Sequence, residues 1–114
     1  MMPTVALDDP LQTLATVSFS GDRAGMCRYL DWLFAGIEIA GKDVIDIGGG
    51  TGWLALYCSL QNARSVTLVE PFGAGSGAGM LDGLRRALHV FNATNVTVVN
   101  ARFPCHDLNR RFDL

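Results

Sequence analysis

A glycine-rich turn after a short apolar segment is the part of the sequence best suited to hold a ligand. Residues 44–52 read Val-Ile-Asp-Ile-Gly-Gly-Gly-Thr-Gly. The β-branched residues favour a strand, and the glycines allow a tight turn with no side chain between the backbone and a ligand. The apolar run at 53–58 predicts a helix that begins at once, so free N–H groups and the positive end of the helix dipole would face the turn. The pattern predicts a site for a polar or anionic group, and a tight turn with only a structural role is the alternative.

The spacing of the glycines and of a later carboxylate narrows the choice of ligand. A dinucleotide fingerprint, G-x-G-x-x-G, needs a glycine where this chain has Trp53, and the third glycine is instead Gly52. Glu70 lies about 20 residues after Gly48, at the end of the apolar segment 65–69. A carboxylate at this distance can accept both hydroxyl hydrogens of a ribose. A solvated charge at a strand end is the alternative, and we favour the ribose.

Amphipathic segments on either side predict the helices that position this turn. Asp22 is a predicted N-cap, because apolar residues recur after it at the spacing of one helical face, and Gly36 is the predicted stop. The residues of that face are Met26, Tyr29, Leu30, Leu33, Phe34 and Ile37. Residues 73–79 alternate glycine with other residues and predict a loop. A second amphipathic helix is expected at residues 80–91.

The first residues of the chain show no clear period. Pro3 and Pro10 break any long helix there, so we expect only a short helical turn near residues 11–16. We therefore divide the chain into a lead-in segment, residues 1–21, and a single domain, residues 22–114.

Strand segments alternate with helical segments, which predicts an α/β fold with a parallel sheet. Strands are expected at residues 44–47, 65–69 and 95–99, in the spatial order 3-2-1. Residues 112–114 have the pattern of the opening of a fourth strand, so we expect a Rossmann-like sheet with flanking helices that is truncated at this point. Ligands of such sheets bind beyond the carboxyl ends of the strands, where the strand order reverses.

These motifs together resemble those of class I S-adenosylmethionine (SAM)-dependent methyltransferases. The matching segments are D-I-G-G-G-T-G at 46–52, V-T-L-V-E-P at 66–71, N-V-T-V-V-N-A at 95–101 and R-F-D-L at 111–114. The resemblance covers about residues 22–114, and the glycine-rich motif is its most specific part. It implies methyl transfer from SAM, which needs mainly positioning because the sulfonium already activates the methyl group.

The resemblance also implies which residues contact the cofactor. These are Asp46, Gly48, Gly49, Gly50, Glu70, Pro71, Phe72 and Ala101. The backbone of Gly48 and Gly50 would lie against the methionine portion of SAM. Asp46 would orient the amino group, and Glu70 would hold the ribose.

The adenine end of the implied site departs from the family pattern. Pro71 or Phe72 would lie along the adenine face, and the stretch around Ala101 would pass near its edge. Many family members carry an acidic residue near position 102, whereas Arg102 can only donate. Adenine would then be read by a backbone group or by stacking. The catalytic residues stay unknown, because in the family the acceptor is oriented from the fourth strand onward.

The composition predicts a soluble globular domain. The 114 residues are 49% hydrophobic and carry a net charge of −2 with no basic run, which argues against a nucleic-acid surface. There is no signal-like segment or apolar stretch of bilayer-spanning length. Three cysteines without a C-x-x-C motif favour a reducing cytoplasm. We expect no metal site, and we interpret residues 105–107, Cys-His-Asp, as a loop and not as a catalytic cluster.

Three functions remain open. The preferred one is the cofactor-binding half of a SAM-dependent methyltransferase whose acceptor is unidentified. The second is a truncated or partner-dependent module that binds SAM or its demethylated product without turnover. The third, a nicotinamide-dependent oxidoreductase, is disfavoured by Trp53. No membrane partner is expected, and the apolar outer edge of the first strand predicts self-association.

Overall fold

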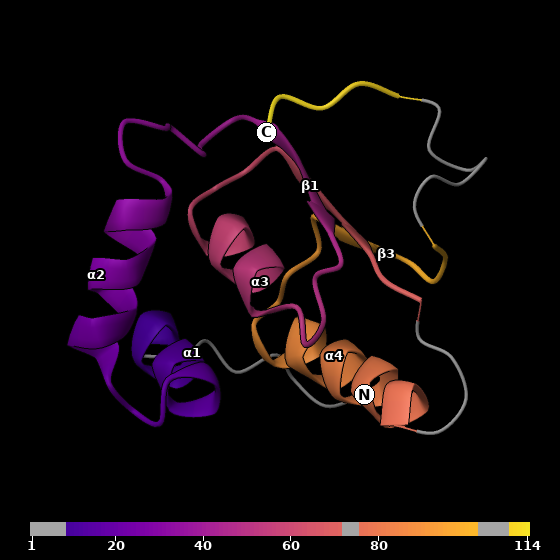
Figure 1. Cartoon of the computed structure of the whole chain (residues 1–114), viewed down its shortest axis with the longest axis horizontal. Coiled ribbons are helices and arrows are strands. Elements are labelled where there is room, and N and C mark those ends of the chain that lie inside the picture. The colour runs from indigo at the N-terminus through magenta and orange to yellow at the C-terminus, as the bar shows by residue number, and fades with distance from the viewer. Residues whose placement is uncertain (1–8, 72–75, 103–109) are drawn as a thin grey trace.

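The computed structural model describes residues 9–71, 76–102 and 110–114. Two helices are followed by three strands that alternate with two further helices (Figure 1), which confirms the predicted α/β fold. The elements are α1 (Pro10–Ser18), α2 (Arg23–Leu33), β1 (Asp43–Ile47), α3 (Trp53–Leu60), β2 (Ser65–Val69), α4 (Ser76–Val90) and β3 (Val96–Val99). None of the helices within these described ranges is both long enough and apolar enough to cross a bilayer.

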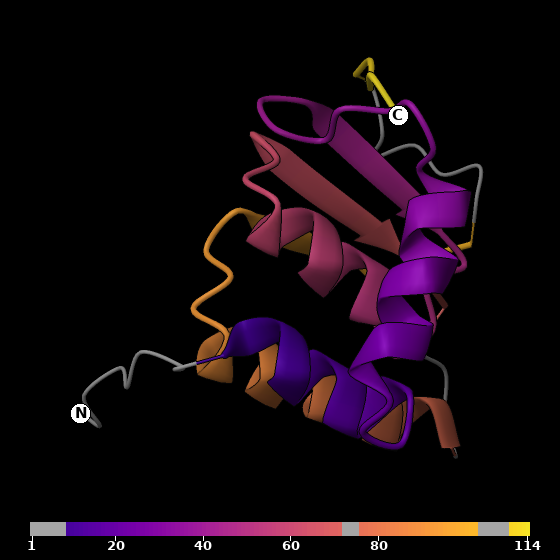
Figure 2. The ribbon, with the colours of Figure 1, turned by 90° about the vertical axis from the view of Figure 1, so that its left-hand side faces the viewer.

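The three strands form a parallel sheet in the order β1-β2-β3, as predicted. The register pairs Val44 with Val66 and Asp46 with Leu68, so these four side chains point to one face of the sheet. Helix α3 lies along the strands on this face (Figure 2). Leu84 of α4 joins the same core, in which Val66 and Leu68 are fully buried. The core therefore forms between the sheet and these helices.

Helix α1 is longer than the short turn that the sequence predicts. Asp9 caps it by accepting a hydrogen bond from the Gln12 N–H at 3.1 Å. Pro10 is the first helical residue, a position whose N–H has no partner within the helix, so proline starts this helix instead of breaking it. Leu14 and Ala15 are fully buried, so α1 belongs to the core of the molecule.

Helix α2 begins as predicted and ends early. Asp22 accepts a hydrogen bond from the Gly25 N–H at 2.8 Å, which confirms it as the N-cap. The helix ends at Leu33, before the predicted stop at Gly36. Ile37 consequently lies beyond the helix and is 45% exposed, so its assignment to the apolar face of this helix is wrong.

Helix α4 begins within the segment that the sequence predicts as a loop. Residues 76–79 are helical, so the loop prediction is wrong for them, and residues 73–75 lie outside the described ranges. Glycine costs a helix about 1 kcal/mol relative to alanine. Burial of apolar side chains farther along α4 offsets this cost. Those in the core are Met80, Leu81, Leu84 and Leu88.

The last two residues of the chain pair with the outer edge of β1. The Leu114 N–H donates to the Asp43 carbonyl at 3.3 Å, and the Ile45 N–H donates to the Leu114 carbonyl at 3.0 Å. This alternation is the pattern of parallel strands. Residues 113–114 therefore lie where the sequence predicts a fourth strand, beside the beginning of β1 (Figure 1), but they do not form a regular strand.

A charged cluster ties the beginning of the sheet together. Asp43 accepts hydrogen bonds from the Arg64 guanidinium and, at 2.6 Å, from the Ser65 hydroxyl. Arg110 lies 3.5 Å from the same carboxylate, and Asp113 accepts from the Asp43 N–H at 2.8 Å. The hydrogen bonds from Arg64 and then Ser65 hold the pKa of Asp43 below its ordinary value. The first residue of β1 is thus bound to β2 and to the chain end.

Candidate functional site

The glycine-rich turn, residues 48–52, lies at the edge of the sheet where all three strands end. β1 leads directly into it, β2 ends just before Glu70, and β3 ends two residues before Ala101. Because the strands are parallel, these residues share the carboxyl edge. Pro71 follows there and is exposed, whereas Phe72 lies outside the described residues. The structure therefore brings the three predicted motifs to one edge.

Glu70 faces the turn. A Cβ atom placed on Gly48 would lie 3.9 Å from Glu70 Oε2. The Gly48 N–H donates to the Val69 carbonyl at 2.7 Å, and the Glu70 N–H donates to the Val99 carbonyl at 3.1 Å. The sheet thus fixes both the turn and the residue that carries the carboxylate. Their predicted proximity is confirmed, and the contact with a ribose stays a prediction.

At two positions in the turn, any side chain would have to displace a neighbouring side chain. Gly52 has φ of +85°, and a Cβ there would overlap Leu84 Cδ1 of α4. A Cβ on Gly49 would come within 2.6 Å of Asp46 Oδ2 and 2.9 Å of Leu68 Cδ1. The backbone of the turn therefore packs directly against core side chains, close to the end of the sheet.

Helix α3 presents an uncapped N-terminus to this edge. Gly52 is its N-cap and supplies no side chain, and the first hydrogen bond of the helix runs from the Leu56 N–H to the Gly52 carbonyl at 2.9 Å. The N–H groups of the first turn are left without helical acceptors. Together with the helix dipole they can bind a carboxylate or another anionic group.

Trp53, the first residue of α3, packs against an aromatic residue that directly follows α1. The Phe19 ring meets the Trp53 ring edge to face, with centroids 5.1 Å apart. The two rings shield one side of the first turn of α3 from water.

Asp46 carries a polar atom that lacks a partner. Its Oδ2 atom is buried beneath Gly49 and accepts no hydrogen bond within the described part of the chain. Burial raises the pKa of Asp46, and the charge of Glu70 raises it further. A buried carboxylate of this kind is stabilised by a cation. The turn consequently lies between free N–H donors of α3 and the unpartnered carboxylate oxygen of Asp46.

The raised pKa of Asp46 predicts a pH-dependent effect of its replacement. The Asp46 carboxyl binds its proton more tightly in the folded state than in the unfolded state. Protonation of Asp46 therefore stabilises the folded protein fully at low pH, and this contribution is lost as the pH rises through the pKa of Asp46 in the folded state. We expect Asp46→Asn to become more stable, relative to the unchanged protein, as the pH rises above about 4. Urea unfolding of both proteins over a pH series measures this difference, and a pH-independent difference would contradict the prediction.

A pocket of about 550 Å³ opens beside the turn, between α1, α3 and α4. Thr51 of the turn and Trp53 of α3 contribute to its wall, and Met80 and Leu84 contribute from α4. The sequence does not predict this pocket, because its wall joins elements that are far apart along the chain. The only feature of the sequence that relates to this pocket is the apolar face expected for the helix that carries Met80 and Leu84. The pocket adds an apolar wall next to the polar turn.

Comparison with known proteins supports the fold at the level of solved structures. No family model matches the sequence, and neither does any curated protein. A protein from Pyrococcus horikoshii assigned as an RNA methyltransferase is 28% identical, with a TM-score of 0.55, and the match covers 82% of this chain and 42% of that protein. Protein arginine methyltransferase 10 of Arabidopsis thaliana is 27% identical, with a TM-score of 0.53, and the match covers 78% of this chain and 26% of that protein.

A third match carries a bound cofactor product. It is the PRMT1 enzyme–prozyme complex of Trypanosoma brucei with AdoHcy, 20% identical, with a TM-score of 0.53, covering 89% of this chain and 27% of that one. The chain spans 26–42% of the length of these three structures. It therefore has the Rossmann-like fold of SAM-dependent methyltransferases.

Proposed function

We propose that this chain is the cofactor-binding part of a SAM-dependent methyltransferase that acts on an acceptor still to be identified. The observation that carries the proposal is the 3.9 Å approach of Glu70 Oε2 to the Cβ position of Gly48. It brings a carboxylate and a side-chain-free turn within reach of one nucleoside-bearing molecule. The bound AdoHcy of the T. brucei complex makes SAM a plausible ligand for this fold.

The residues at the carboxyl edge suit the parts of SAM. Glu70 accepts hydrogen bonds from the ribose hydroxyls, and the free N–H groups of the first turn of α3 bind the carboxylate of the methionine portion. The ammonium group of SAM supplies the cation that Asp46 lacks. Pro71 and Ala101, with Phe72, are assigned to the adenine. SAM itself supplies the electrophilic methyl group, and the chain contributes its orientation.

Calorimetric titration with SAM and with NAD tests this assignment. We expect heat and saturable binding with SAM and none with NAD, because Trp53 stands where a dinucleotide fingerprint has glycine. Tight binding of NAD with no binding of SAM would overturn the assignment and favour an oxidoreductase.

A second candidate is a module that binds SAM or its demethylated product without turnover. The two candidates differ in one experiment, in which radiolabelled SAM is incubated with the chain and a mixture of candidate acceptors. Product formation by the 114 residues alone would exclude the module. Binding without product would favour it.

We also propose that the chain self-associates through the outer edge of β1. Residues 113–114 pair with Asp43 and Ile45 on this edge, and Ile47 at its end is 50% exposed. Exposed apolar edges template pairing with another chain. We expect the sedimentation coefficient to rise with protein concentration, and Ile47→Lys to abolish this rise. A single monomer boundary at all concentrations would refute the proposal.

The thiols support a proposed cytoplasmic location. Cys27 and Cys58 are both free within the described ranges. Burial raises the pKa of Cys58 to about 11, with a further contribution from Asp46, so this thiol is unreactive at neutral pH. Such unpaired thiols suit a reducing compartment.

A further inference from the structure

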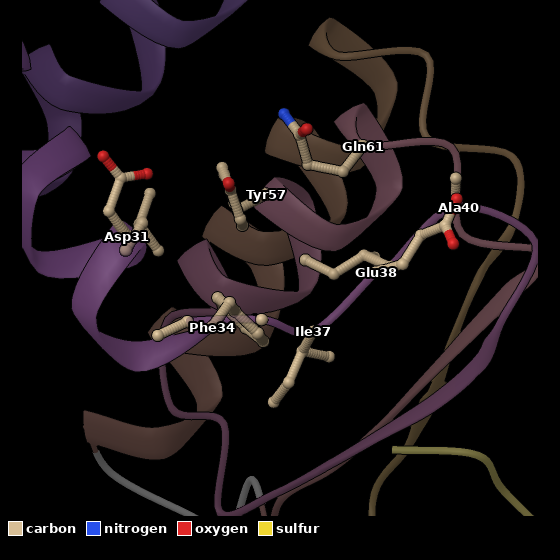
Figure 3. Close-up of a pocket in the computed structure, with 11 residues that line it drawn as sticks. Asp31, Phe34, Ile37, Glu38, Ala40, Tyr57 and Gln61 are labelled. Carbon is tan, nitrogen blue, oxygen red and sulfur yellow. The ribbon is translucent and has the colours of Figure 1, made fainter.

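A second pocket lies at the other end of the sheet. It has a volume of about 390 Å³ and lies between the end of α2, the connection at residues 34–40 and the end of α3 (Figure 3). Its walls come from residues that precede β1 and from the last turn of α3, whereas the glycine-rich turn follows β1 and precedes α3. The pocket is therefore separate from the candidate cofactor site.

Both charged side chains that line this second pocket are acidic. Asp31 comes from α2 and Glu38 from the connection, and no lysine or arginine among the described residues lines the pocket. The ion pairs of the described ranges join arginines to Asp9, Asp43 and Asp113, so none of them neutralises either carboxylate. The pocket thus carries two negative charges without a protein cation.

Two helix C-termini add to this negative potential. Phe34 is the C-cap of α2 and Gln61 is the C-cap of α3, and both residues line the pocket. The negative end of a helix dipole lies at its C-terminus. Neither helix has a basic residue in its last turn to balance it. The two carboxylates and the two helix ends therefore all contribute negative potential to this pocket, which favours a cation.

The rest of the wall is apolar and suits the hydrocarbon part of a cationic ligand. Leu30 and Ile39 are 1% and 6% exposed, and the rings of Phe34 and Tyr57 stack with centroids 5.7 Å apart. Aromatic faces attract cations. Burial raises the pKa of Tyr57, and the charge of Asp31 raises it further, so its hydroxyl stays neutral and can accept a hydrogen bond. The polar ends of the Asp31, Tyr57 and Gln61 side chains are visible in Figure 3.

We propose that this pocket binds an alkyl-ammonium or guanidinium group. The charged group of the ligand lies near Asp31 and Glu38, and its alkyl chain lies against Phe34 and Tyr57. The group belongs either to a free amine or to a lysine or arginine side chain of a partner protein. The site does not depend on methyl transfer at the other edge. Because both carboxylates are exposed, we expect a dissociation constant in about the millimolar range.

Titration with n-butylguanidinium, followed by amide NMR shifts, tests the site. We expect saturable shifts at Asp31, Tyr57 and Gln61, and none at Gly48 or Glu70. The uncharged analogue 1-butanol should cause no saturable shift. The double variant Asp31→Asn with Glu38→Gln should weaken binding about tenfold, whereas Glu70→Gln, a neutralisation at the other edge, should leave it unchanged. Unchanged affinity in the double variant, or equal binding of 1-butanol, would overturn the proposal.

A blocked peptide with one arginine distinguishes the two sources of the cation. Binding tenfold tighter than n-butylguanidinium, with added shifts at the exposed Trp32 and Ile37, would support a partner side chain. Equal affinity would support a free amine. Failure of both ligands to bind would refute the cation site, and it would leave the SAM titration at the other edge unaffected.

Discussion

Replacing Gly52 with alanine is expected to destabilise the protein by about 2–4 kcal/mol, the sum of a left-handed backbone penalty and an overpacking penalty. Gly52 has φ of +85°, and a Cβ at this position would overlap Leu84 Cδ1. Such a loss is a large share of the about 5–15 kcal/mol by which a domain is stable. Urea unfolding followed by circular dichroism measures it.

Gly50 provides the matched control for this substitution. It also has a positive φ, of +57°, but a Cβ there would meet nothing within 4 Å. Gly50→Ala should therefore lose only the backbone share, about 1 kcal/mol. In a Leu84→Ala background, Gly52→Ala should likewise cost only about 1 kcal/mol. Equal destabilisation by the two glycine substitutions would show that the contact with Leu84 does not matter.

Replacing Glu70 with glutamine is expected to weaken SAM binding by about 10–100-fold, because hydrogen bonds to a charged acceptor contribute about 1.5–3 kcal/mol. The glutamine amide can accept from one ribose hydroxyl, but its NH₂ group cannot accept from the other. Isothermal titration calorimetry with SAM measures the loss.

Two controls separate this ribose contact from a general effect of charge. Asp31→Asn removes the same charge at the opposite edge of the sheet, and it should leave SAM affinity unchanged. S-adenosylhomocysteine keeps the ribose but lacks the sulfonium charge, so Glu70→Gln should weaken its binding by a similar factor. A loss confined to SAM would mean that Glu70 acts only through its charge, and the ribose assignment would be wrong.

Local patterns predicted the strands and the start of α2 closely. The β-branched segment at 65–69 forms β2 with the predicted bounds, and the Asp22 side chain caps α2 as expected. The errors arose where a local rule met a tertiary effect. Pro10 starts α1 because the first helical position needs no N–H donor. The glycines at 76–79 are helical because packing farther along α4 outweighs their propensity.

The candidate site was predictable where it follows from strand ends, and unpredictable where it depends on packing. Parallel strands place Gly48, Glu70 and Ala101 at one edge, so their proximity follows from the order of the strands. The contact of Gly52 with Leu84 and the unpartnered Asp46 Oδ2 arise between residues whose side chains meet only in the folded core. The pocket near Asp31 forms from two helix ends and a connection, and none of these has a sequence motif.

The charged cluster around Asp43 makes the two ends of the sheet unequal in their resistance to local opening. Side chains from β1, β2 and the chain end cross-link the starting end, whereas glycines follow β1 at the other. Hydrogen exchange should consequently begin where a ligand would enter, while the starting end stays closed. The pKa of Asp43 is lower in the folded state, so its stabilising interactions are lost as the pH falls from about 4 towards that pKa. The difference in hydrogen exchange between the two ends of the sheet should then disappear.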